Sequence, residues 1–178
     1  MKNKNLKGFT LIELLIVIGI IAILAGIVLV AVNPAQQFGK ANDSERKSEI
    51  GTLLSAVYQY QTSPTARGAL PQCNVNSVPT VIPTCDGGGT GLYDGALELG
   101  TAVTAYDCST TLVPSYLREI PIDPSTGHTA AATGYYICQE VVGGLSRIFV
   151  IAPATEVFTT DGGCQVPGTT TATMCVSG

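Results

Sequence analysis

Six cysteines, one histidine and one glutamate in an apolar run are the side chains of this 178-residue chain that could do chemistry. None of the cysteines stands in a CxxC spacing and no histidine lies near a cysteine pair, so the sequence does not predict a zinc site. No nucleophile-elbow pattern accompanies His128, which we expect to be a solvated loop residue. The cysteines are Cys73, Cys85, Cys108, Cys138, Cys164 and Cys175.

Glu13 is the only charged residue in the run of residues 9–32, which is otherwise interrupted only by Thr10, Gly19 and Gly26. A helix over this run is about 36 Å long at about 1.5 Å per residue, enough to cross a hydrocarbon core of about 30 Å. An ionisable residue inside such a span is costly and is a functional candidate by default. The alternative is an interfacial glutamate without a role, favoured only by the dipole of the helix N-terminus.

Three lysines precede the apolar run, and the next basic residue after Lys7 is Lys40. This asymmetry predicts a cytoplasmic N-terminus, with the remainder of the chain outside. A secretory signal peptide is the competing interpretation, but its apolar region is usually about 7–15 residues and ends in an A-x-A-like site. Here the run is longer, and the small residue placed like a cleavage site is Gly8, before the run.

The stretch KGFTLIELLIVIGIIAILAGI, which begins at Lys7, resembles the N-terminus of type IV pilins and type II secretion pseudopilins. In that family a short basic leader is cut after a glycine, the new N-terminal phenylalanine is N-methylated by the same peptidase, and the fifth mature residue is a glutamate. The resemblance implies cleavage between Gly8 and Phe9, N-methylation of Phe9 and a role for Glu13 in assembly. That role is to pair with the free Phe9 amine of a neighbouring subunit, which neutralises both charges and sets the axial register.

The resemblance also implies partners and a location. The partners are other pilin subunits in a helical homopolymer, the prepilin peptidase/methyltransferase, the membrane, and an inner-membrane assembly platform with its cytoplasmic ATPase. The precursor would be a single-pass protein of the cytoplasmic membrane that later enters an extracellular filament. The chain has nine basic and 13 acidic residues and a pI near 4.8, which argues against a duplex nucleic-acid binder. A polytopic membrane protein would need further apolar runs, and the sequence has none after residues 9–32.

Residues 33–63 are expected to continue the helix as an amphipathic half. At Asn33-Pro34 two interpretations stay open: Asn33 caps a new helix that begins with Pro34 and uses Gln36 in a capping box, or Pro34 kinks one long helix. The family's commonest proline position falls earlier, where this chain has Val30, so the resemblance does not decide between them. Helical spacing predicts a buried stripe of Ile50, Leu53, Leu54 and Val57, followed by the polar Gln61. Ser63-Pro64 predicts the end of the helix.

The charged residues near the start of this half suggest either a solvated helix surface or salt bridges between subunits. They are Asp43, Glu45, Arg46, Lys47 and Glu49.

Residues 64–178 are expected to form a disulfide-bearing globular region. Prolines and glycines predict a loop over residues 64–91. Residues 92–106 are ambiguous, with a short helix as one expectation. Residues 110–127 indicate a helical turn followed by an extended segment. The last of these contains YL..IP.DP (residues 116–124), which resembles a segment before the sheet in major pseudopilins and many bacterial pilins. Two β-branched runs, residues 135–142 and 145–152, are joined by Gly143-Gly144 and predict a hairpin, with residues 156–159 as a third strand.

The six cysteines lie in the translocated part, where an oxidising environment favours disulfides. Spacing alone leaves fifteen connectivities open; the set that we favour is Cys73–Cys85, Cys164–Cys175 and Cys108–Cys138. Some major pseudopilins bind calcium in a C-terminal loop, with which Asp161 could be compared, but one carboxylate is too few ligands for a confident site. We therefore expect no cofactor, with calcium the only candidate.

The sequence predicts an α+β fold in which a long N-terminal helix packs its second half on a small antiparallel sheet. Its segments would be a leader (1–8), a membrane-spanning and filament-core half (9–32), an amphipathic half (33–63) and the globular region (64–178). We expect a structural subunit and not an enzyme. We favour a type IV pilin that polymerises into a pilus for adhesion, twitching motility or DNA uptake. The alternatives are a pseudopilin of a type II secretion or competence system and a monomeric anchored protein or secreted enzyme.

Overall fold

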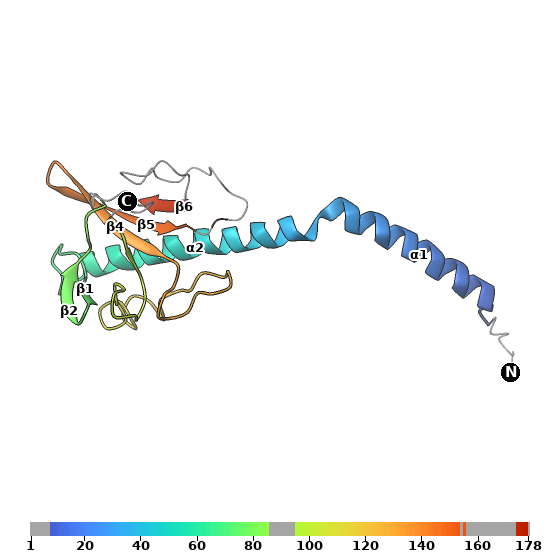
Figure 1. The fold of residues 1–178 in the computed structure, drawn as a ribbon, viewed down its shortest axis with the longest axis horizontal. Coiled ribbons are helices and arrows are strands. Elements are labelled where there is room, and N and C mark those ends of the chain that lie inside the picture. Colours follow the sequence, from blue (N-terminus) through green and yellow to red (C-terminus); the bar gives the residue numbers. More distant parts are fainter. Residues whose placement is uncertain (1–7, 86–94, 154, 156–173, 178) are drawn as a thin grey trace, which may run out of the picture. The chain divides into compact units, whose positions relative to one another are not determined.

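The computed structural model describes residues 8–85, 95–153, 155 and 174–177. The chain divides into two compact units, Met1–Phe38 and Gly39–Gly178, each of which is described by itself. We call Gly39–Gly178 the globular unit. Figure 1 shows the helices and strands along the chain and labels all of them except β3.

The apolar run forms helix α1, Leu11–Val32, and helix α2 begins immediately afterwards, Pro34–Thr62. Asn33 separates them because its backbone is left-handed (φ 38°), which caps the C-terminus of α1. The structure therefore supports the interpretation in which Pro34 begins a new helix. It differs in detail, because Asn33 serves as the C-cap of α1, and the Gln36 amide donates to the Asn33 carbonyl at 3.1 Å.

Helix α2 buries the predicted stripe in the globular unit. Ile50, Leu53 and Val57 are at most 1% exposed, and Leu54 packs against the same core. The helix ends at Thr62, directly before Ser63-Pro64, as expected. The amphipathic prediction for this part of the chain is confirmed.

The stripe packs on an antiparallel sheet in the order β3-β4-β5-β6. The predicted hairpin is present as β4, Tyr136–Val142, and β5, Leu145–Ala152, joined through Gly143 and Gly144, both at positive φ. Positive φ at both central residues is the geometry of a two-residue hairpin turn. The expected third strand at residues 156–159 lies outside the described residues, and the strand beside β5 is β6, Met174–Ser177.

The two faces of the sheet contact different partners. One face meets α2 through Ile148, Val150 and Ala152, whereas Phe149 and Ile151 on the other face pack with three cysteines. This alternation follows from the two-residue period of a strand. The α+β class and the packing of a helix on an antiparallel sheet are as the sequence predicted.

Two local predictions are wrong. Within the expected loop 64–91 the chain forms a hairpin of β1, Gln72–Val75, and β2, Val78–Val81, whose turn places Asn76 and Ser77 at positive φ. In the described part of 92–106 there is no helix, because β3, Leu97–Glu98, pairs with β4 instead. The helical turn expected near residue 110 is present: the Leu112 amide donates to the Cys108 carbonyl, and extended chain follows.

Two of the three disulfide bonds that we favoured, Cys73–Cys85 and Cys108–Cys138, are also wrong. Cys73 is bonded to Cys108 and Cys85 to Cys138, with Cα–Cα distances of 4.7 and 5.0 Å. Backbone pairing explains both bonds: Asn74 bridges to Asp107, which places Cys108 beside β1, and the Cys85 amide donates to the Gln139 carbonyl.

Cys175 is disulfide-bonded as well, while its expected partner, Cys164, lies outside the described residues.

Candidate functional site: the N-terminal segment

Thr10 and Glu13 form a reciprocal capping box at the start of α1. The Thr10 hydroxyl accepts from the Glu13 amide at 3.2 Å, and the Glu13 carboxylate accepts from the Thr10 amide at 3.1 Å and from its hydroxyl at 3.0 Å. Such a box satisfies amide donors that the first helical turn leaves without partners. Glu13 is therefore engaged by its own chain in the precursor, a contact that the resemblance did not predict.

The expected cleavage bond lies just outside this helix. Gly8 and Phe9 have no helical structure, both are exposed, and Phe9 keeps 89% of its surface accessible. A bond outside a helix can enter a protease site without unwinding the helix first. The assignment of Gly8–Phe9 as the cut, of Phe9 as the methylated residue and of Glu13 as the assembly residue stays a prediction.

Helix α1 presents apolar side chains in every direction, and all of its residues are exposed among the residues that the structure describes. Its 22 residues span about 33 Å at about 1.5 Å per residue, with a mean hydropathy of 3.3 over its most apolar window. Among the described residues it is the one helix long and apolar enough to cross a membrane. A helix that is apolar all round needs lipid or other helices around it.

The family described as the prokaryotic N-terminal methylation motif matches residues 3–29. This range contains most of the basic leader, the Gly8–Phe9 bond, the capping box and most of α1. This N-terminus is similar to that of type IV pilin and pseudopilin precursors. No curated protein and no solved structure matches the chain.

A prepilin N-terminus implies processing by prepilin peptidase and assembly into pilus-like polymers. It indicates a structural role, and α1 fits the membrane anchor of such precursors. The motif ends at residue 29, so the features of the globular unit must be argued from its own structure.

The globular unit contains a buried ionic cluster that the sequence did not predict. The Arg46 guanidinium donates to Asp123 from Nε at 2.7 Å and from Nη2 at 3.0 Å, and to Asp43 from Nη1 at 2.7 Å. The side chains of Arg46 and both aspartates are fully buried in these ion pairs. Buried charges are tolerated only when they are paired and hydrogen-bonded, so the cluster is complete only with the 117–125 segment in place.

Asp123 is the aspartate of the YL..IP.DP segment, and it joins that segment to α2. Burial alone would raise the pKa of its carboxyl, but hydrogen bonds from Arg46 and Ser125 hold the pKa below its ordinary value. The Ser125 amide donates to Asp123 at 2.8 Å. The segment named by the resemblance therefore has an internal role, which is to complete the Arg46 cluster.

Glu49 makes a second polar contact between α2 and the rest of the globular unit, with Tyr135 directly before β4. Its carboxylate accepts a hydrogen bond from the Tyr135 hydroxyl. Burial raises the pKa of the Glu49 carboxyl, although the Tyr135 hydrogen bond opposes the shift. The interpretation of residues 43–49 as a purely solvated or inter-subunit surface is wrong for Asp43 and Arg46, whereas Glu45 and Lys47 are exposed.

His128 is a half-buried loop residue, and the described residues contain no group of histidine, cysteine or acidic side chains that could hold a metal. Asp161, the residue compared with pseudopilin calcium ligands, lies outside the described residues.

Proposed function

We propose that the mature chain, from Phe9 onward, is a pilin that polymerises into a type IV pilus used for adhesion, twitching motility or DNA uptake. The observation that carries this proposal is the methylation motif at residues 3–29, joined to an apolar helix that finds no partner in its own chain. In the membrane lipid covers α1, and in the filament other copies of α1 replace the lipid.

Glu13 sets the register of assembly in this proposal. Cleavage at Gly8–Phe9 creates an amine one residue before the Thr10 cap, and the Glu13 carboxylate of a neighbour pairs with it. Leaving either charge unpaired in the apolar filament core would cost several kcal/mol, so the pair selects one axial register. Before assembly the Glu13 carboxylate accepts hydrogen bonds from Thr10 of its own chain, and after assembly it pairs with a neighbour's Phe9 amine. The carboxylate therefore has a partner in both states.

The apolar surface itself supplies little preference for the filament, because lipid tails are about as apolar as the side chains of α1. Close packing of helices then matters, and small residues permit it. Gly19 and Gly26 have open space on their Cα side, so a neighbouring helix could approach there. Assembly of this kind can be reversible, as subunit storage in a membrane requires.

The remaining parts of the proposal follow from the family. The prepilin peptidase/methyltransferase processes the precursor, and an inner-membrane platform with its cytoplasmic ATPase extracts it. The N-terminus is cytoplasmic and the globular unit lies outside. The chain acts as a structural subunit and not as an enzyme, without a cofactor and without nucleic-acid recognition of its own.

A pseudopilin of a type II secretion or competence system is the second candidate. The YL..IP.DP segment favours it, whereas the disulfide bonds of the globular unit favour a filament exposed outside the cell.

Electron microscopy of cells that express the gene at its native level tests the choice. A pilin predicts long, abundant surface filaments that disappear on gene deletion. A pseudopilin predicts no such filaments and a loss of protein secretion or of DNA uptake.

A further inference from the structure

The end of the β4–β5 hairpin projects beyond its neighbouring strands. Among the described residues, strand β6 pairs only with residues 149–152 of β5, and β3 pairs only with Tyr136 and Ile137 of β4. Residues 140–147 therefore form a two-stranded ribbon, which lies at the end of the globular unit where α2 finishes (Figure 1). We call residues 140–147 the tip.

The tip is apolar although it is exposed. Val141, Val142 and Leu145 keep 56%, 63% and 79% of their surface accessible. Glu140 and Arg147 face each other across the two strands at the base of this apolar end. An exposed ribbon with clustered aliphatic side chains is a typical contact surface.

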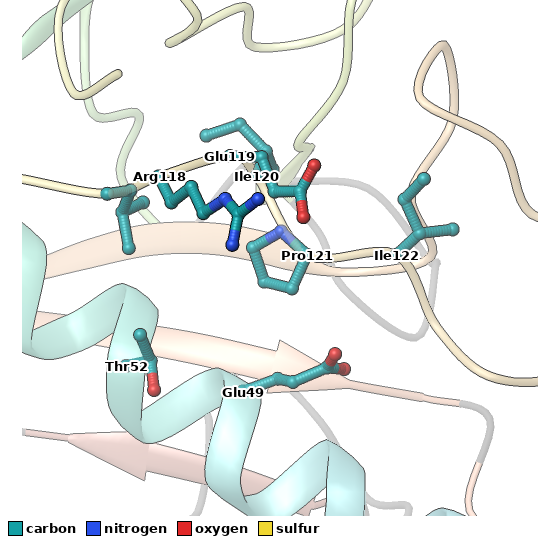
Figure 2. A pocket seen from close by; sticks show the side chains of 8 residues that line it. Glu49, Thr52, Arg118, Glu119, Ile120, Pro121 and Ile122 are labelled. Carbon is teal, nitrogen blue, oxygen red and sulfur yellow. The ribbon is translucent and has the colours of Figure 1, made fainter. Parts of the chain in front are cut away.

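A groove of about 400 Å³ opens elsewhere on the same unit, between α2 and residues 117–122. Figure 2 shows Glu49 and Thr52 on the helix below it, and Ile120, Pro121 and Ile122 on the segment above. Arg118 and Glu119 belong to the same segment. The groove thus combines an apolar wall with one cation, Arg118, and two carboxylates, Glu49 and Glu119.

The charges of the tip and of the groove are complementary. The tip carries Glu140 and Arg147, and the groove carries Arg118 and Glu119. Within the part of the chain that the structure describes, none of these four side chains forms an ion pair. Each patch therefore offers one cation and one anion that form no ion pair among the described residues, whereas Glu49 in the groove already accepts a hydrogen bond from Tyr135.

We propose that the tip of one subunit docks in the groove of a neighbouring copy, with Arg147 facing Glu119 and Glu140 facing Arg118. This inference rests on the proposed polymer, and it names a contact between globular units in addition to the α1 core. The two patches differ, so the contact is heterologous, and a heterologous contact that does not close produces an open helical filament. Glu49 at the groove and Thr62 at the end of α2 are roughly 20 Å apart along the helix at about 1.5 Å per residue. Because the tip lies at the end where α2 finishes, docking displaces one subunit from the next along the direction of α2.

Charge reversal tests this contact in full-length protein in cells. Arg147→Glu and Glu119→Arg each place like charges together, and the double variant restores an opposite pair. Arg67→Glu is the matched control, because Arg67 is an exposed arginine outside both patches. The amount of chain in sheared filaments is divided by the mature chain in the membrane, so that a folding defect is not counted as an assembly defect.

We expect each single variant to lower this ratio about five-fold, which corresponds to about 1 kcal/mol per contact. The double variant should return to within about two-fold of wild type, and Arg67→Glu should match wild type. If Arg147→Glu does not accumulate, Glu119→Arg alone decides the test.

Normal filaments from the single variants, or no rescue in the double variant, would overturn the docking while leaving the pilin proposal intact. If the wild-type chain forms no filament, the polymer itself is wrong.

Discussion

Arg46 on α2 donates two hydrogen bonds to Asp123, a residue 77 positions later in the chain, and both side chains are fully buried. With Asp43 as the second acceptor, the guanidinium connects the helix to the extended segment that forms one wall of the groove. This pair links the stability of the globular unit to the surface by which we propose that subunits meet.

Replacing Arg46 should be strongly destabilising. Arg46→Met leaves the buried carboxylates of Asp43 and Asp123 without their cation, and breaking a buried pair in this way costs about 3–5 kcal/mol. Chemical denaturation of the detergent-solubilised mature chain measures the loss in the free energy of unfolding. Lys47→Met, at an exposed position one residue away, is the control and should change it by less than about 0.5 kcal/mol. A similar small change for Arg46→Met would show that the cluster does not hold the fold.

Stability should depend on pH through two carboxyl groups with opposite signs. Asp123 has a lowered pKa in the folded state, so its contribution is present above its unfolded pKa of about 3.9 and is lost as the pH falls through the folded value. Glu49 has a raised folded pKa, so the folded state gains stability as the pH falls through that value towards about 4.3.

The thermal midpoint should therefore rise slightly as the pH falls from neutral towards about 4.3 and then fall below about pH 4. Circular dichroism of Glu49→Gln should lose the rise and keep the fall. Asp123→Asn should start from a lower midpoint and show a weaker fall. A fall of wild-type size in Asp123→Asn would assign the acid sensitivity to other groups.

The disulfides should be complete in the native protein. With three bridges, the intact mass before reduction lies six hydrogen masses below the reduced value, and no thiol reacts. Peptide mapping without reduction should recover the bonds Cys73–Cys108 and Cys85–Cys138. The paired substitution Cys73→Ser with Cys108→Ser should cost about 2–4 kcal/mol by releasing the loop of the unfolded chain. A Cys73–Cys85 peptide would contradict the fold of this region.

Glu13→Val separates assembly from folding. The precursor should insert, fold and be cleaved, because the globular unit begins at Gly39 and the cut precedes the helix. The unpaired Phe9 amine then costs about 3–5 kcal/mol per subunit in the filament, which is a hundredfold or more in the assembly constant. Filaments should be absent or sparse while mature chain in the membrane stays at its normal level.

The capping box requires a control, since Glu13→Val also removes it. Thr10→Ala removes the capping hydroxyl and keeps the carboxylate, at a cost to the helix of about 1 kcal/mol. If both variants lose filaments equally, the helix cap explains the defect. If both assemble normally, Glu13 is only an interfacial glutamate.

Local patterns predicted the elements whose signals are strong and continuous. The apolar run, the stripe through Ile50, Leu53 and Val57, and the Gly143-Gly144 hairpin are all present. The hairpin of β1 and β2 was missed because Pro79 looked like a strand breaker. In a two-stranded sheet Pro79 pairs with Asn74 on a short strand, where a missing amide donor is tolerated.

The sequence did not predict the ionic cluster for a different reason. Asp43 and Arg46 lie seven and four residues before Ile50, on the same helical face as the buried stripe. That spacing was the available signal, but charged residues are ordinarily assigned to the solvent. Their partner Asp123 is distant in sequence, as are the partners of Cys73 and Cys85, and no local spacing reports such contacts.

The N-terminus of the chain recovered from filaments tests the central claim most directly. Sheared surface filaments should yield a chain whose intact mass and N-terminal peptide correspond to N-methyl-Phe9 through the C-terminus. Recovery of that species would join the cleavage, the methylation and the polymer in one measurement. A mature terminus near Ala35, as a signal peptidase acting after α1 would leave, would contradict the assignment of this chain as a prepilin.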